Sequence, residues 1–300
     1  MRLCNRRTAL RLTLMFLLCA TSHAQAVVTC FANVSSISTS FNPLNPTDLV
    51  TTGIWSVTCS RALSDPGTTF SFDLEANNGV NFTGQTSRVA LAGLYYTYEL
   101  YRSNSSANSE EWGSVPNRRF TGTVDLTTGT SYTTPSLQFF LRVPAGQAVQ
   151  PAGIYTDVVT TTLTYPSKSA ITSVGTFNIA LNSIASCTSV VPASLTFNYI
   201  SFQGAPATPS ANFIVNCTTG LPYTMTLDGL AQPAPINVID DALNLSYSVQ
   251  LSSGGGTGTG TDQFHQIMGT MPANQSGTCT VLPCTNAAAT NKTRTLTVTY

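Results

Sequence analysis

The sequence predicts an all-β protein that consists of two immunoglobulin-like β-sandwich domains in tandem. Apolar and polar residues alternate over short runs, such as 54–58, 70–74, 137–143 and 158–165, and Gly, Pro, Asn and Asp separate these runs. Runs of this kind, rich in Val, Thr, Tyr and Phe, are typical of strands that bury one face, and no long stretch has helical periodicity. Many short strands with turns between them favour a sandwich, with Trp55 in its core.

A repeated cysteine frame divides the chain into two copies. Cys30 and Cys59 stand 29 positions apart, and Cys187 and Cys217 stand 30 apart. An apolar, Ser/Thr-rich stretch follows the first cysteine of each pair and reaches a Phe-Asn dipeptide, at 41–42 and again at 197–198. Because an even number of cysteines in an exported chain indicates disulfides, the repeat predicts one bond in each copy.

The remaining mature cysteines, Cys279 and Cys284, form a third predicted pair, which occurs in the second copy only. Zinc is the competing interpretation of the cysteines. It needs ligand spacings that are absent, because no C-x-x-C pair occurs and His265 is the only histidine outside the first 26 residues. We therefore expect three disulfides, no metal and no cofactor.

The first 26 residues have the pattern of a secretory signal peptide. Four arginines precede an apolar segment at 12–20, which is too short to span a bilayer, and Ala24-Gln25-Ala26 is a small-x-small cleavage signal. Four of the 13 basic residues leave with this segment, so 9 remain against 13 acidic ones. A mature chain without a basic patch is not expected to bind nucleic acid.

Catalysis finds little support in the sequence. A Ser-His-Asp arrangement would have to use His265, and no Gly-x-Ser-x-Gly motif accompanies it. The glycine-threonine run at 254–261 lacks the Lys-Ser/Thr ending of a phosphate-binding loop, so we expect a flexible loop there. The protein is therefore predicted not to be an enzyme.

The end of the first copy resembles a known family. Pro151-Ala152-Gly153-Ile154-Tyr155-Thr156-Asp157, followed by the alternating residues 158–165, is similar to the closing motif of the spore coat protein U domain. That family also has a cysteine pair of this spacing near the start of the domain. In the second copy, residues 291–300 keep the strand pattern but lack the lead-in, and Cys279 and Cys284 lie near its place. The resemblance covers the mature chain as two copies.

This resemblance implies a mechanism of assembly. Members of the family include subunits of archaic chaperone–usher pili, which are incomplete sandwiches of six strands. A periplasmic chaperone first fills the missing position, and a strand from the adjacent subunit then replaces it at an outer-membrane usher. Few residues precede Cys30 that could be donated, which implies a subunit at the tip of the fibre. The chain also ends within its last alternating run, so the second domain is expected to accept a strand.

Residues 174–184 are predicted to complete the first domain from within the same chain. The residues expected in this donor strand are Val174, Phe177, Ile179, Leu181 and Ile184. The alternative is that this run is the first strand of the second domain. With the donor strand assigned to the first domain, we expect a signal peptide at 1–26 and domains at 27–184 and 185–300.

Loops at the pole of the first domain that lies away from the second are the expected adhesive surface. They are placed at 60–68, 103–117 and 166–172, and their candidate contact residues are Ala62, Leu63, Trp112, Val115, Pro116 and Ile171. Trp112 lies in a polar, turn-like context, and an exposed Trp there would mark a binding surface; the alternative, which carries at least as much weight, is that it folds over the core.

The predicted function is therefore that of a pilus tip adhesin for surface attachment and biofilm formation. It would pass through the periplasm and act outside the cell, with a chaperone, an usher, a neighbouring subunit and a surface ligand as partners. A secreted coat or matrix protein is the alternative function, and a secreted hydrolase is a remote one.

Overall fold

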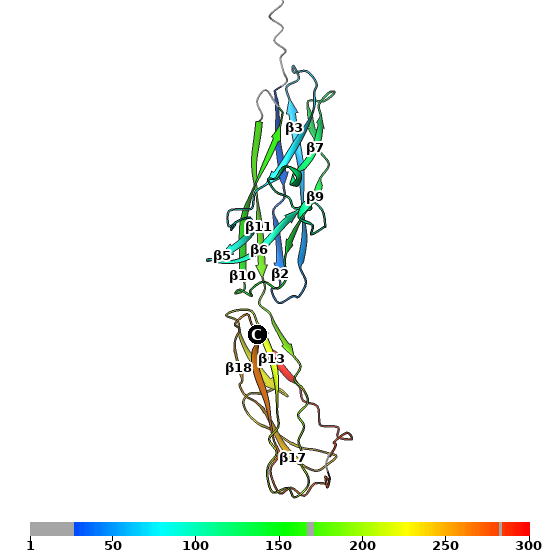
Figure 1. Ribbon diagram of the computed structural model, residues 1–300, viewed down its shortest axis with the longest axis vertical. Coiled ribbons are helices and arrows are strands. Elements are labelled where there is room, and N and C mark those ends of the chain that lie inside the picture. The colour runs from blue at the N-terminus through cyan, green and yellow to red at the C-terminus, as the bar shows by residue number, and fades with distance from the viewer. Residues whose placement is uncertain (1–26, 167–170, 282–283) are drawn as a thin grey trace, which may run out of the picture.

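The computed structural model describes residues 27–166, 171–281 and 284–300, with the side chain of residue 171 excepted. The protein is all-β, as the sequence predicted, apart from two short 3-10 helices, η1 (Asn108–Glu110) and η2 (Pro116–Arg118). Within the described ranges, no helix is long and apolar enough to cross a membrane. The strands form two groups that lie end to end, and we call them the first unit and the second unit (Figure 1).

The first unit contains eleven strands: β1 (Val28–Val34), β2 (Ile37–Phe41), β3 (Leu49–Arg61), β4 (Thr69–Ala76), β5 (Ser87–Leu91), β6 (Leu94–Tyr101), β7 (Phe120–Asp125), β8 (Ser131–Thr133), β9 (Leu137–Val143), β10 (Gly153–Tyr165) and β11 (Ile171–Ser183). Their order is β1-β3-β9-β6-β5-β10-β11-β2, and β4 also pairs with β10. Strands β1 and β2 are consecutive in the sequence and lie at the two ends of this order, so the first strand of the chain begins in one layer and continues in the other.

Alternation places the large apolar side chains of the first unit between its layers. Trp55 is 2% exposed, as expected for a core residue, and its ring lies against Phe72 and Phe120. Tyr96, Tyr155, Leu141 and Leu163 are also fully buried. This cluster is continuous from β1 to β11 and contains no residue of the second unit.

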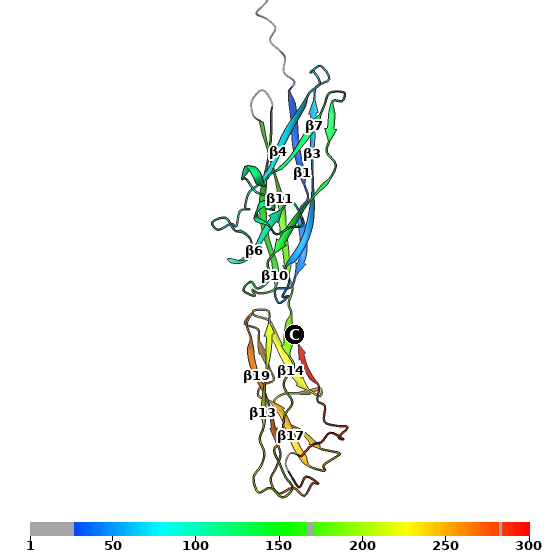
Figure 2. The same ribbon diagram turned by 45° about the vertical axis from the view of Figure 1, so that its right-hand side comes forward.

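The second unit contains nine strands: β12 (Cys187–Val190), β13 (Ser210–Cys217), β14 (Pro222–Leu227), β15 (Leu230–Ala231), β16 (Ile236–Ile239), β17 (Ser246–Leu251), β18 (Gly255–Thr257), β19 (Gln263–Thr270) and β20 (Leu296–Thr299). One sheet has the order β12-β13-β19-β17-β16, and the other holds β15, β14, β18 and β20. A separate apolar cluster, including Phe213, Met225 and Leu251, fills the space between them. Strand β20 ends near the first unit, as both views show (Figures 1 and 2).

The glycine-threonine run at 254–261 is not the flexible loop that the sequence suggested. Its first part is strand β18, which pairs with β14 from Pro222↔Thr257 to Thr224↔Gly255. A Cβ atom on Gly254 would lie 2.1 Å from the carbonyl oxygen of Gln232, and one on Gly258 would lie 2.3 Å from that of Thr218. The glycines therefore allow close packing of backbone on backbone, which a sequence does not distinguish from flexibility.

Candidate strand-acceptor site

Strand β11 in the first unit shows what a completed sandwich requires. It pairs antiparallel with β10 over thirteen residues, from Gly153↔Ser183 to Tyr165↔Ile171. On its other side it pairs parallel with β2, from Ile179↔Ile37 to Ser183↔Phe41. The strand therefore fills the position between the last strand of the cysteine-framed copy and the second half of its first strand.

The inward face of β11 carries three of the five residues predicted for the donor strand. Phe177 is 2% exposed, and Ile179 and Leu181 are fully buried. Val174 also lies in β11 but on its outward face, where it is 65% exposed, and Ile184 is a correction, because β11 ends at Ser183 and Ile184 is 38% exposed. Successive residues of a strand point to opposite faces, so even-numbered positions lie outside when the odd-numbered ones lie inside.

Strand β20, which ends the second copy as β10 ends the first, has only one strand beside it. It pairs with β14 from Thr224↔Thr299 to Leu227↔Leu296, and no other strand in the described ranges pairs with it. Its side chains Leu296 and Val298 pack against the core but are only partly buried. In β10, by contrast, which pairs with β11, Val159 and Leu163 are fully buried.

The segment that corresponds to β2 in the second unit, residues 193–199, has no strand partner in the described part of the chain. Its side chains still alternate: Tyr199 is buried, and Leu195 and Phe197 are half-buried against the core. The Phe197 ring lies 5.2 Å from that of Tyr247. In the first unit, β11 joins the edges of β2 and β10. Segment 193–199 and the unpaired side of β20 are the corresponding edges in the second unit, and we call them the acceptor edges.

The flanks of the first acceptor edge expose an unusual amount of apolar surface. Val190 and Val191 before it are 60% and 87% exposed, and Phe202 after it is 70% exposed. In the first unit, Phe41 of β2, which corresponds to the half-buried Phe197, is 5% exposed. Exposed apolar residues beside an unpaired strand edge are typical of a surface that another strand covers. Sequence reasoning used Phe197 only as a landmark; the alternation of Leu195, Phe197 and Tyr199 is the signal that could have identified this edge.

The segment that leads into the last strand differs between the units, as the motif comparison anticipated. In the first unit the buried carboxylate of Asp157 accepts hydrogen bonds from the Tyr98 hydroxyl at 2.7 Å and from the backbone N–H of Val80 at 3.0 Å. Burial and this carboxylate raise the pKa of the Tyr98 hydroxyl far above its ordinary value, so the hydroxyl remains a donor. These bonds hold residues 77–81 against β10.

Two aspartates and a disulfide take this role in the second unit. Asp240 accepts a hydrogen bond from the Asn286 side chain at 2.8 Å, and Asp241 accepts bonds from Thr290. Cys279 is bonded to Cys284 and is 2% exposed, with its sulfur 3.1 Å from the carbonyl oxygen of Tyr199. This disulfide therefore lies at the end of the 193–199 edge. The structure also joins the two framing pairs, Cys30–Cys59 and Cys187–Cys217.

Trp112 is a correction to the predicted adhesive residues. It is 4% exposed, its ring stacks on Phe177 of β11 at 6.0 Å, and its indole N–H donates to the carbonyl oxygen of Leu74 at 3.1 Å. The polar neighbours that suggested exposure instead anchor the loop: Glu111 pairs with Arg118, and Arg119 pairs with Glu75 at 2.8 Å. The loop thus turns Trp112 inward against the donor strand.

The other predicted adhesive residues are divided between two places. Ala62 and Leu63 are exposed in the loop between β3 and β4, at the end of the first unit far from the second (Figure 1), and Leu63 is 86% exposed. The Arg61 guanidinium braces this loop by donating to the carbonyl oxygens of Leu126 and Asp65. Val115 and Pro116 are exposed at the start of η2, where Val115 is the N-cap and Pro116 the first residue.

The third predicted loop, 166–172, lies mostly outside the described residues. Residues 167–170 lie outside the described residues, and so does the side chain of Ile171, whose backbone begins β11. The segment 126–130, between β7 and β8, lies at the pole beside the β3–β4 loop, because the N–H of Leu126 donates to the carbonyl oxygen of Thr68. Sequence reasoning did not place this segment at the pole.

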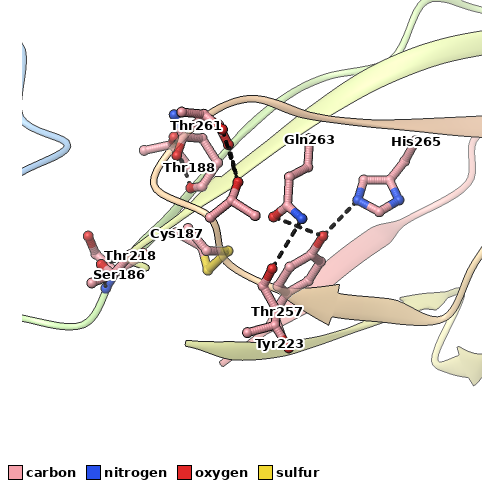
Figure 3. Close-up of a disulfide and its surroundings, with 12 residues drawn as sticks. Ser186, Cys187, Thr188, Thr218, Tyr223, Thr257, Thr261, Gln263 and His265 are labelled. Atoms are coloured by element: carbon pink, nitrogen blue, oxygen red, sulfur yellow. Dashed lines mark hydrogen bonds between the residues drawn. A yellow bond between two sulfur atoms is a disulfide. The ribbon is translucent and has the colours of Figure 1, made fainter. Parts of the chain in front are cut away.

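His265 has the surroundings of a structural residue. Its Nε2 lies 2.8 Å from the Tyr223 hydroxyl (Figure 3), and its Nδ1 lies 3.0 Å from the Ser253 hydroxyl. No carboxylate in the described ranges bonds to the ring, and burial lowers its pKa. Among the described residues, no group of three metal-ligating side chains comes together.

These features define an all-β chain in which β11 lies between β10 and β2 in the first unit, whereas β20 in the second unit pairs with one strand within the described residues. Residues 15–162 match the Spore Coat Protein U domain, and this part of the chain belongs to that family. The match covers the first cysteine-framed copy, so membership of the second copy stays a prediction. A search of curated protein sequences gave no significant match.

Solved structures match this chain at low sequence identity. A chain of the CsuC–CsuE chaperone–tip adhesion subunit pre-assembly complex from archaic chaperone–usher Csu pili of Acinetobacter baumannii matches with a TM-score of 0.50 and 13% identity, covering 91% of this chain and all of that chain. The CupB6 tip adhesin of Pseudomonas aeruginosa matches with a TM-score of 0.36 and 9% identity, covering 84% of this chain and 90% of that one. The first similarity supports the immunoglobulin-like fold of pilus proteins.

Proposed function

We propose that this protein is the tip adhesin subunit of an archaic chaperone–usher pilus and that it mediates surface attachment and biofilm formation. The observation that carries the proposal is the contrast between β10, which β11 covers, and β20, whose outer edge has no strand beside it in the described residues. In the first unit, a domain at 27–184, β11 already occupies the position between β10 and β2. The second unit, a domain at 185–300, receives one at its acceptor edges.

The incoming strand is supplied first by a periplasmic chaperone and then, at an outer-membrane usher, by the adjacent subunit. A donated strand gains main-chain hydrogen bonds along β20 and buries alternate apolar side chains over Leu296, Val298 and Phe197. The likeness to a chaperone–tip subunit complex supports this order of partners. The protein then acts outside the cell, at the end of the fibre. Its function depends on assembly with other subunits and not on catalysis.

The test is to supply the missing strand artificially. A second copy of residues 166–184, appended directly after Tyr300, reproduces the connection that follows Tyr165 in the first unit. We expect the melting temperature of the second unit to rise and its dependence on a co-expressed chaperone to fall. The matched control carries serines in place of the residues copied from Phe177, Ile179 and Leu181. An equal rise with the control, or no rise with either, would refute strand acceptance and would favour a coat or matrix protein.

The adhesive part of the proposal has its own test. The pole loop with Ala62 and Leu63 contacts the surface, since its apolar tip is exposed and Arg61 holds it in place. The change Leu63→Ser should reduce attachment of piliated cells to a hydrophobic surface without reducing the amount of pili. Phe264→Ser is the control, because Phe264 is 76% exposed but lies in the second unit. Equal loss of attachment with both variants would contradict the assignment.

A further inference from the structure

The connection between the two units is short and fully engaged. Only residues 184–186 separate β11 from β12. The N–H of Ile184 donates to the carbonyl oxygen of Phe41 in the first unit, at 3.0 Å. Ser186 belongs to the second unit through Thr218: the Ser186 N–H donates to the Thr218 hydroxyl at 3.0 Å, and the Thr218 N–H donates to the Ser186 carbonyl oxygen at 2.9 Å. The linker therefore has little freedom to act as a hinge.

Direct contacts join the units on two sides of this linker. The Ser186 hydroxyl donates to the side-chain oxygen of Asn42 at 2.8 Å. Ser186 itself lies next to the Cys187–Cys217 disulfide (Figure 3). The Thr219 hydroxyl donates to the carbonyl oxygen of Val149 in the loop between β9 and β10. Contacts at two separate points resist bending that a single point would allow.

The end of the glycine-threonine run forms the rest of the contact. Gly260 has a φ of +74°, its N–H donates to the carbonyl oxygen of Cys217 at 3.1 Å, and a Cβ atom there would lie 2.5 Å from the carbonyl oxygen of Val149. Two requirements coincide at this position, since the left-handed conformation favours glycine and the neighbouring unit leaves no space for a side chain.

The loop that presses on Gly260 is itself braced by the core of the first unit. The Gln150 N–H donates to the Tyr96 hydroxyl at 2.9 Å, and Tyr96 is fully buried. The side-chain oxygen of Gln147 accepts from the backbone N–H of Thr97 at 2.6 Å. Val149 thus lies between two anchored residues, so a displacement of the second unit meets a fixed surface.

We propose that residues 217–219 and 258–260 of the second unit form a docking surface for the loop 144–150 of the first unit, and that this joint holds the two units in one end-to-end alignment. Interfaces between domains of one chain permit relative motion by default when they are small and polar. This interface is small, but its short linker, its two hydroxyl contacts and the close approach at Gly260 compensate for its size. The role of the glycine-threonine run is therefore mechanical.

The experiment measures the distance distribution between the units by pulsed electron paramagnetic resonance on the full mature chain. Nitroxide labels are attached through non-natural amino acids at exposed Thr52 and Asn212, which leaves the disulfides intact. We expect one narrow distribution for the unmodified chain and a distribution at least twice as wide for Gly260→Ala. Gly220→Ala is the matched control: Gly220 has a φ of +78°, but a Cβ atom there meets nothing within 4 Å.

A second pair of variants keeps the proposal testable if Gly260→Ala does not fold. Thr219→Val removes the hydroxyl that reaches Val149, whereas Thr259→Val removes one that bonds only to Thr261. Thr219→Val should widen the distribution, and Thr259→Val should not. A wide distribution in the unmodified chain, or equal widths for each variant and its control, would overturn the proposal. None of these outcomes depends on whether the protein is a pilus subunit.

Discussion

Strands β10 and β20 end the two copies of the same framework, yet they differ in the strands that pair with them. Strand β10 lies between β4 and β11, and its inward side chains are shielded from water on both sides. Strand β20 lies beside β14 alone within the described residues, and Leu296 and Val298 remain partly exposed. The comparison teaches that a repeat in sequence fixes the strands of a sandwich but not its completion, which depends on the segment that follows each copy.

The largest effect is expected from removing the segment that completes the first unit. Deletion of residues 174–184, with the units rejoined by a flexible linker of equal length, should abolish the melting transition of the first unit, because Phe177, Ile179 and Leu181 leave its core together. Differential scanning calorimetry, which resolves the transitions of the two units, is the measurement. An unchanged first transition would mean that β11 does not complete this unit.

Trp112 ties the loop between β6 and β7 to the donor strand, and the second copy has no tryptophan. Trp112→Ala should destabilise the first unit by about 3–5 kcal/mol, which is the usual cost of truncating a buried aromatic side chain. Val115→Ala, in the same loop at a side chain that is 50% exposed, should change stability by less than about 0.5 kcal/mol. Urea denaturation provides both values, and similar losses for the two variants would contradict the inward position of Trp112.

Asp157 tests how the lead-in to β10 is held. Asp157→Ala leaves the Tyr98 hydroxyl and the N–H of Val80 without their acceptor. Each unsatisfied buried donor costs about 1–3 kcal/mol, so for two donors we expect a loss of about 2–6 kcal/mol in the first unit. Asp125→Ala is the control, because Asp125 bonds to Thr69 and Thr127 at the exposed surface. Thermal unfolding at neutral pH compares the two, and a larger loss for Asp125→Ala would refute the role of Asp157.

The smallest effects concern pH, and they should have opposite signs in the two units. Burial raises the pKa of Glu99 in the first unit to about 7, and Glu111 adds to the rise. The folded first unit therefore binds this proton more tightly than the unfolded chain, so its stability is greatest below the unfolded value of 4.5 and declines as pH rises toward 7. Glu99→Gln should remove this decline.

Burial lowers the pKa of His265 in the second unit below 6.5. The unfolded chain therefore binds this proton more readily, so the contribution of His265 is fully present above pH 6.5 and is lost as pH falls through the folded pKa. His265→Gln should flatten this part of the curve. Melting temperatures recorded between pH 4.5 and 8 give both slopes, and slopes of the same sign in both units, unchanged by these two substitutions, would contradict the assignments.

The parts of the fold that sequence reasoning reached depend on local patterns. Alternation identified the strand character of residues 54–58 and 158–165. It also identified Phe177, Ile179 and Leu181, the odd-numbered residues of β11 that point into the core. At Trp112 it left exposure and burial both open, and the structure shows burial, because the charged residues of this loop are engaged in ion pairs within the fold. Sequence reasoning failed at residues 254–261, because glycine is required both where a chain is mobile and where two backbones nearly touch. Both cases concern contacts between residues distant in sequence.

Strand β11 runs without interruption into the linker that carries the second unit, and it lies antiparallel to β10 along its whole length. A pull on the second unit is therefore directed along β11 rather than across it. In that geometry the hydrogen bonds of the thirteen pairs with β10 are loaded together, as in a lap joint under shear, and are not peeled apart one after another. The strand that completes the first unit is thus also the element that would bear tension between an attached surface and whatever holds the second unit.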